Sequence, residues 1–140
     1  MRVGFVGVGR LGGPLATSLM RSGFSLVVHD RDRSAAEGLE ASGACWADSC
    51  AELARSIDVV ITCLPSPAAV ASALEAEDGV LAGLASGSTW IDMSTNDRHE
   101  LLRLAEAADE VGVATLEAPV TGGVHLAATG AVGMTSTVGA

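Results

Sequence analysis

Apolar and polar positions follow two recurring patterns along the chain. Short, almost entirely apolar runs such as residues 58–63 are typical of strands buried on both faces of a parallel sheet. Between them lie longer segments with apolar residues three or four positions apart, as in residues 97–111, a pattern typical of helices that bury one face. The predicted strands are residues 2–6, 25–29, 44–47, 58–63, 89–92, 113–117 and 132–138. The predicted helices are residues 11–22, 33–42, 50–55, 67–74 and 97–111, with a helical turn at 122–129.

The alternation of these strands and helices predicts the fold class. It is typical of an α/β, doubly wound, mostly parallel sheet with helices on both faces. Gly23, Gly43 and Gly112 each follow a predicted helix, where glycine commonly ends a helix in a left-handed conformation. The chain has no repeats or low-complexity segments, and its length fits one domain over residues 1–140.

A glycine motif links the first predicted strand to the first predicted helix. Residues 7–12 have the sequence Gly-Val-Gly-Arg-Leu-Gly, which in this context is typical of a turn that binds the pyrophosphate of a dinucleotide. Gly7 permits the tight turn, Gly9 lets the backbone approach the pyrophosphate, and Gly12 lets the helix pack close to the strand. Free N–H groups and the helix dipole then bind the negative charge. The motif predicts a Rossmann-type fold; the alternative is a glycine turn that only packs.

Asp30 ends the second predicted strand, about twenty residues after the glycine motif, as a dinucleotide site requires. Its carboxylate is placed to accept from both ribose hydroxyls of the adenosine half. The alternative role is an N-cap for the helix that follows. Arg31 and Arg33 come next, and a guanidinium here can stack on adenine or bind a 2′-phosphate. We therefore expect NAD or NADP as the cofactor, with NAD favoured through Asp30.

Composition excludes several classes of partner. The net charge of −9 and the pI near 4.5 argue against a nucleic acid or an anionic membrane surface. Cys45, Cys50 and Cys63 match no metal-binding spacing, so we expect free thiols in a reducing compartment, or simply small buried residues. No long apolar run or signal sequence is present, and we expect a cytoplasmic protein without a bound metal.

Four motifs in order resemble the N-terminal domain of the β-hydroxyacid dehydrogenases, the family of the 3-hydroxyisobutyrate, tartronate semialdehyde and 6-phosphogluconate dehydrogenases. They lie at residues 7–14, 58–65, 91–95 and 117–123 and cover almost the whole chain. The resemblance implies an NAD(P)-dependent oxidoreductase acting on CH–OH. Its substrate would be a small 3-hydroxyacid or the corresponding semialdehyde.

The resemblance also implies roles for further residues. Leu64 and Pro65 would lie against the cofactor and Thr95 near the nicotinamide ribose, although Pro65 can equally end a strand. Thr95 can likewise cap the helix near Asp97, a role open to its neighbours too. The predicted cofactor-binding residues are Gly7, Gly9, Arg10, Leu11, Gly12, Asp30, Arg31, Leu64, Pro65 and Thr95. The predicted receptor for the substrate carboxylate is Thr121, Gly122 and Gly123.

One departure from the family affects catalysis. The family's general acid/base is a lysine beyond the last motif, and the chain contains no lysine. We expect a truncated, catalytically incomplete domain without the family's C-terminal helical domain, and His125 is a poor substitute for the lysine. Apolar surface left without that domain predicts a homodimer or an aggregation-prone fragment. The alternatives are a stand-alone dinucleotide-binding module or sensor without catalysis, and an imine-reductase-like relative.

Overall fold

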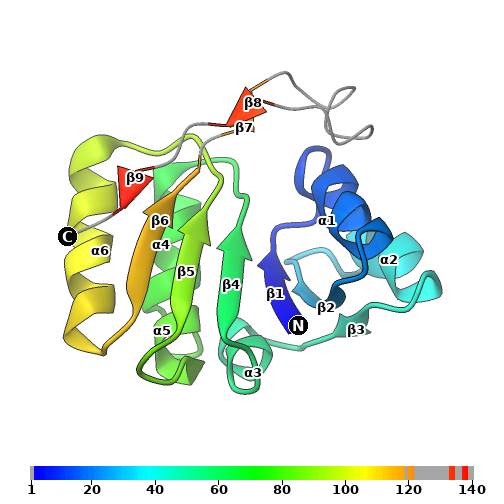
Figure 1. Cartoon of the computed structure of the whole chain (residues 1–140), viewed down its shortest axis with the longest axis horizontal. Coiled ribbons are helices and arrows are strands. Elements are labelled where there is room, and N and C mark those ends of the chain that lie inside the picture. Colours follow the sequence, from blue (N-terminus) through cyan, green and yellow to red (C-terminus); the bar gives the residue numbers. More distant parts are fainter. Residues whose placement is uncertain (1, 119, 122–132, 135–136, 139–140) are drawn as a thin grey trace.

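The computed structural model describes residues 2–118, 120–121, 133–134 and 137–138 (Figure 1). Its centre is a sheet in the order β3-β2-β1-β4-β5-β6-β9, in which all neighbours are parallel except β6 and β9. The strands are β1 (Arg2–Val6), β2 (Ser25–His29), β3 (Cys45–Trp46), β4 (Val59–Thr62), β5 (Thr89–Asp92), β6 (Ala114–Glu117) and β9 (Thr137–Val138). A separate antiparallel pair consists of β7 (Val120–Thr121) and β8 (Gly133–Met134). The predicted α/β, Rossmann-type doubly wound fold is confirmed.

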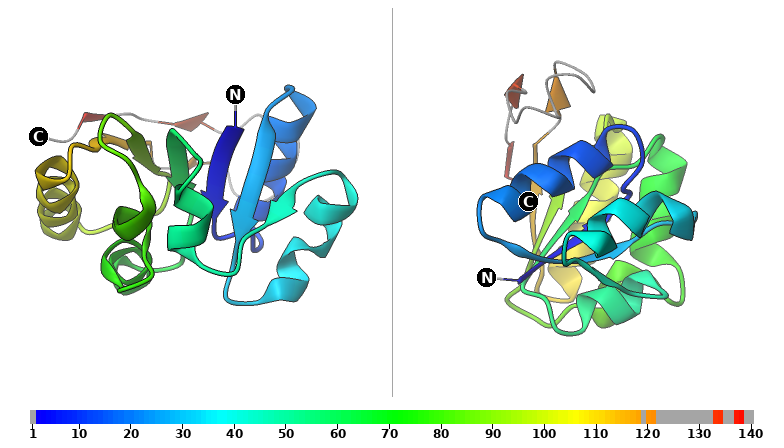
Figure 2. Two further views of the ribbon diagram at one scale, coloured as in Figure 1. Left: turned by 90° about the horizontal axis from the view of Figure 1, so that it is seen from below. Right: turned by 90° about the vertical axis from the view of Figure 1, so that its right-hand side faces the viewer.

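Helices cover both faces of the sheet (Figure 2). One face packs against α1 (Gly12–Arg21), the 3₁₀ helix η1 (Arg33–Ala36) and α2 (Glu37–Ala41). The other packs against α3 (Cys50–Ala54), α4 (Pro67–Glu75), α5 (Val80–Gly83) and α6 (Arg98–Glu110). Along β2, Leu26 and Val28 face the first group and Val27 faces the second, because successive side chains of a strand point to opposite faces. This double burial explains the nearly continuous apolar strands.

Local chemistry accounts for where the helices begin and end. Gly23, Gly43 and Gly112 have φ of +97°, +111° and +78°, so each predicted helix stop is confirmed as a glycine in the left-handed region. The side chain of Ser66 caps α4 by accepting from the Ala69 N–H. Helices α3 and α6 have side-chain caps from a serine and an aspartate in the same way.

Several predicted elements differ from the structure. The helix predicted at 33–42 is divided into η1 and α2, and the short helix α5 was not predicted. The strand predicted at 132–138 corresponds to β8 and β9, which belong to different sheets, and β7 was not predicted either. Two-residue strands and a four-residue helix are too short to show a hydrophobic period. The helical turn predicted at 122–129 lies outside the described residues.

Surface features bear on association and on membranes. Among the large apolar side chains of residues 2–118, the exposed ones are Leu102 at 40% and Val111 at 44%. This part of the chain therefore shows no broad cluster of exposed large apolar side chains, and the expected dimerisation or aggregation stays a prediction. Within the described ranges, no helix has the length and apolar character needed to cross a bilayer.

Candidate dinucleotide-binding site

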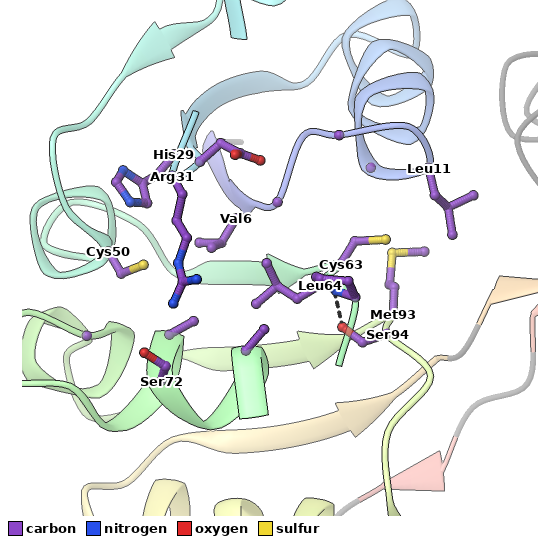
Figure 3. A pocket seen from close by; sticks show the side chains of 18 of the residues that line it. Val6, Leu11, His29, Arg31, Cys50, Cys63, Leu64, Ser72, Met93 and Ser94 are labelled. Carbon is purple, nitrogen blue, oxygen red and sulfur yellow. Dashed lines mark hydrogen bonds between the residues drawn. The ribbon is translucent and has the colours of Figure 1, made fainter. Parts of the chain in front are cut away.

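A cavity of about 760 Å³ lies at the carboxyl ends of β1, β2, β4 and β5 (Figure 3). The chain crosses from one side of the sheet to the other between β1 and β4, and ligands of open α/β sheets bind at such a switch point. The volume is within the range of about 300–1,000 Å³ typical of ligand sites. All ten predicted cofactor-binding residues line this one cavity: Gly7, Gly9, Arg10, Leu11, Gly12, Asp30, Arg31, Leu64, Pro65 and Thr95.

The three glycines of the motif have different structural requirements. Gly7 has φ of +93°, and a Cβ on it would overlap the Cys63 carbonyl oxygen. A Cβ on Gly12 would overlap the Gly7 carbonyl oxygen, so helix α1 could not pack as closely. A Cβ on Gly9 would meet no heavy atom within 4 Å. The fold thus explains Gly7 and Gly12, whereas Gly9 lines the cavity and has open space where a Cβ would be.

The start of α1 is also open to a ligand. Leu11 occupies the N-cap position and makes no side-chain cap hydrogen bond, in contrast to the capped helices α3, α4 and α6. The first N–H groups of a helix have no intrahelical acceptor and carry the positive end of its dipole. In α1, Pro14 has no N–H and the Gly13 N–H already donates to the Gly9 carbonyl oxygen at 2.9 Å, so the N–H groups of Leu11 and Gly12 are the ones left at the cavity wall, where helix starts commonly bind anions.

Asp30 connects the end of β2 to the glycine turn. Its Oδ2 accepts from the Val8 N–H at 2.9 Å, and its Oδ1 accepts from the Asp32 N–H at 2.9 Å. The N-cap of η1 is Asp32, whose side chain accepts from the Ser34 N–H at 3.0 Å. The N-cap role that we considered as an alternative for Asp30 is therefore filled by Asp32. Each Asp30 oxygen has further lone pairs with which to accept from a ligand hydroxyl.

The two arginines after β2 have different surroundings. Arg31 lines the cavity and extends from the end of β2 toward α4 (Figure 3). The Arg33 guanidinium carbon lies 4.5 Å from the centre of the Trp46 ring, and its Nη2 lies 3.2 Å from Oε2 of Glu40. Arg33 is thus bound to the protein surface beside the cavity, and Arg31 is the arginine of this pair that a ligand would meet.

A buried carboxylate lies beneath the other side of the cavity. Asp92, at the end of β5, is 0% exposed. Its Oδ1 accepts from the Thr62 hydroxyl and the Ser94 N–H, both at 3.0 Å, and its Oδ2 accepts from the Asn96 amide at 3.1 Å. Thr62 in turn accepts from Trp90 Nε1 at 2.9 Å. These hydrogen bonds offset the cost of burying a polar carboxylate.

This network fixes two loops of the cavity relative to each other. The Ser94 hydroxyl oxygen accepts from the Leu64 N–H at 2.8 Å (Figure 3). It therefore joins the loop after β5 to the loop after β4, and both loops line the cavity. Thr95 is next in the chain, and its suggested capping role is filled by Asp97, which accepts from the Glu100 N–H. In the sequence, the sign of this buried hydrogen-bond network is that an acidic residue, Asp92, interrupts the apolar residues Ile91 and Met93.

The thiols on the cavity wall are held in their neutral form. Burial raises the pKa of Cys63 to about 11, with a smaller contribution from the Asp92 carboxylate. Burial likewise raises the pKa of Cys50 to about 11, with a smaller contribution from Asp78. Cys45 lies elsewhere and is exposed, so it is not the small buried residue that we considered; all three cysteines are free, as predicted.

Sequence reasoning missed part of the wall. Helix α4 presents small side chains three or four positions apart, and the end of β2 contributes His29. The small residues had a visible helical spacing, but only the fold shows that this face of α4 meets a cavity. The wall residues from α4 are Ala69, Ser72 and Ala73. Of the predicted substrate receptor, Thr121 belongs to β7, while Gly122, Gly123 and His125 lie outside the described residues.

The fold and the cavity together define a Rossmann-type dinucleotide-binding domain. The sequence model of the NAD binding domain of 6-phosphogluconate dehydrogenase matches residues 2–139, and the chain belongs to this family. The chain is 39% identical over 129 residues to an NAD-dependent L-serine dehydrogenase of Pseudomonas aeruginosa, covering 92% of this chain and 43% of that protein.

Solved structures agree with this assignment. The 3-hydroxyisobutyrate dehydrogenase of Mycobacterium tuberculosis with L-serine has a TM-score of 0.88 and 30% identity, covering 96% of this chain and 45% of the other. Psf3 in complex with NADP+ and 2-OPP has a TM-score of 0.92 and 34% identity, covering 97% of this chain and 48% of the other. The chain thus spans less than half the length of these relatives.

Proposed function

We propose that the chain is the cofactor-binding domain of an NAD(P)-dependent dehydrogenase of small 3-hydroxyacids or their semialdehydes. The observation that carries the proposal is the space beside Gly9. The fold does not require glycine there, whereas a ligand lying on the backbone between Gly9 and Asp30 does. The bound nicotinamide would supply the hydride acceptor or donor. The protein would supply the binding groups and their orientation.

Three groups of the chain fit the parts of a dinucleotide. The N–H groups at the uncapped start of α1 suit a pyrophosphate. The Asp30 carboxylate suits the ribose hydroxyls of the adenosine half. Two backbone N–H groups hold its oxygens in place, and each oxygen has a lone pair left with which to accept from a hydroxyl. The rigidly joined loops that carry Leu64 and Thr95 suit the nicotinamide half. Together these groups support an extended ligand along the carboxyl edge of the sheet.

NAD is the proposed preferred cofactor. Asp30 would lie close to an additional 2′-phosphate, and like charges in contact repel. Arg31 opposes this effect because its guanidinium lines the same cavity, whereas Arg33 is bound to Trp46 and Glu40. With the Asp30 carboxylate at the ribose position and Arg31 opposing it, NAD is favoured over NADP by a modest factor.

A small hydroxyacid substrate is proposed from the relatives. Two of them are named for L-serine or 3-hydroxyisobutyrate, and residues 117–123 resemble the motif with which the family binds its substrate. Thr121, Gly122 and Gly123 would bind the carboxylate through a hydroxyl and unhindered N–H groups. Since the 140 residues contain no lysine, the chain by itself would bind cofactor without the lysine-dependent proton transfer.

Calorimetry on the purified chain tests the proposal. NAD and NADP should both bind, NAD more tightly, and no NADH should form with L-serine or 3-hydroxyisobutyrate. A chain that binds neither dinucleotide would contradict the assignment of the cavity. A chain that oxidises either hydroxyacid would contradict the proposed dependence on a lysine. A stand-alone sensor module would also bind the dinucleotide without turnover. The two proposals differ when the chain is combined with a helical dehydrogenase domain, because the sensor module would then still show no activity.

A further inference from the structure

The hydrogen bond of His29 fixes the state of its two ring nitrogens. His29 ends β2, and its Nδ1 lies 2.9 Å from the Ala47 carbonyl oxygen. A carbonyl oxygen can only accept, so Nδ1 must be the nitrogen that carries hydrogen. In the neutral ring, Nε2 is then an acceptor with a lone pair. Among the hydrogen bonds of the described residues, the one made by the His29 ring is through Nδ1, which leaves Nε2 for a ligand.

The neighbours of His29 hold its ring in place. The centres of the His29 and Trp46 rings are 5.3 Å apart. Trp46 is fixed in turn by its Nε1–H bond to Asp48 Oδ1 at 2.8 Å and by the Arg33 guanidinium at 4.5 Å from its ring centre. The direction of the free lone pair is therefore set before any ligand arrives, and little conformational entropy is lost when it is used.

His29 lies at the end of the cavity where the base of a dinucleotide would be bound. The glycine turn and Asp30 would hold the pyrophosphate and the adjoining ribose, so the base of the same nucleoside lies next along the wall. In that direction Figure 3 shows His29 on the same side as Arg31, Cys50 and Ser72. The Cys50 thiol is neutral because burial raises its pKa to about 11. Besides His29, the polar side chains of the cavity lining near Cys50 are Arg31, Ser72 and Asp78.

We propose that His29 Nε2 accepts a hydrogen bond from the exocyclic amino group of adenine and so makes the site specific for adenine dinucleotides. This inference rests on the proposed function. Hypoxanthine carries a carbonyl oxygen in place of the amino group, so a hypoxanthine dinucleotide would set one acceptor against another. Arg31, on the same wall, can only donate and would favour that carbonyl. The two side chains therefore predict opposite base preferences.

Comparison of NAD with nicotinamide hypoxanthine dinucleotide tests the proposal without any variant. The dissociation constants are measured by calorimetry at pH 8. The wild-type chain should bind NAD roughly tenfold more tightly, since one hydrogen bond is gained and one repulsive contact avoided. Equal affinities, or tighter binding of the hypoxanthine dinucleotide, would overturn the role of His29 and favour Arg31.

Two matched variants assign the effect to the residue. His29→Phe keeps a flat ring beside Trp46 and should remove the discrimination, weakening NAD roughly three- to tenfold and leaving the hypoxanthine dinucleotide unchanged. His99→Phe, on an exposed position of α6, should leave both affinities unchanged. Discrimination that survives in a folded His29→Phe variant would refute the proposal. A wild-type chain that binds neither dinucleotide would instead remove the proposed function and this inference together.

Discussion

Gly9 offers a test that separates binding from folding. A Cβ at this position would meet no heavy atom within 4 Å, and Gly9 is not among the glycines with positive φ. Gly9→Val should therefore leave the fold intact. Loss of glycine freedom in the unfolded chain should make Gly9→Ala neutral or slightly stabilising, by up to about 1 kcal/mol.

The same substitution should be severe for the ligand. The side chain of Gly9→Val would occupy the space in which a pyrophosphate approaches the backbone. A hydrogen bond to a charged group contributes about 1.5–3 kcal/mol. Displacing the pyrophosphate from two N–H groups therefore costs about 3–6 kcal/mol, or roughly 10²- to 10⁴-fold in affinity. Calorimetric titration with NAD measures this loss, and a thermal melt shows whether the variant is folded.

Two other glycines provide controls. Gly38→Val introduces the same side chain at a position that is also open but lies on α2, outside the cavity, and should leave NAD affinity unchanged. Gly12→Ala would press against the Gly7 carbonyl and should lower the free energy of unfolding by about 1–3 kcal/mol or more. A folded Gly9→Val variant with wild-type affinity for NAD would refute the cofactor role of the glycine turn.

Three further outcomes are expected. Asp30→Ala should weaken NAD and reduce the preference over NADP in the same titrations, and a variant with wild-type affinity for both would show that Asp30 only ties the turn together. Asp92→Asn turns one acceptor of the buried network into a donor and should lower the free energy of unfolding, measured with denaturant, by about 1–3 kcal/mol. It should also lower the affinity for NAD more than the affinity for ADP-ribose. Equal losses of affinity would refute a positioning role at the nicotinamide half. The pKa of Cys63 is raised to about 11, so the fraction of thiolate should grow about tenfold per pH unit from pH 7 to 10. The rate at which iodoacetamide alkylates Cys63, measured by mass spectrometry, should rise in the same proportion. A rate independent of pH would contradict that pKa.

Much of the fold could be predicted because its signals are local. The bounds of β1, β2 and β5 agree with the predicted strands, since a strand buried on both faces is mostly apolar. Three predicted helix stops are glycines with positive φ, a conformation that other residues rarely adopt. The ten predicted cofactor-binding residues share one cavity because the carboxyl ends of parallel strands meet at one edge. Their role in binding stays a prediction.

The remaining features depend on contacts between distant segments. Arg31 and Arg33 have the same side chain and are two residues apart. Their different directions are set by Trp46 on β3, which binds only Arg33. Asp92 breaks the apolar pattern of β5 and shows its purpose only when Thr62 on β4 lies beside it. The sequence pattern reports which face a residue occupies, not which partner it finds there.

The positions of the two tryptophans give the protein two internal spectroscopic reporters. The chain has two tryptophans and no tyrosine, so its ultraviolet emission comes from Trp46 and Trp90. Trp46 is half-buried against His29 at the proposed base end, while Trp90 is fully buried and bound to Thr62 near the proposed nicotinamide end. Trp46→Phe would leave a signal from Trp90, whose emission overlaps the absorption of reduced nicotinamide. Occupancy of the two halves of the cavity could then be followed separately, by quenching at one indole and by energy transfer from the other.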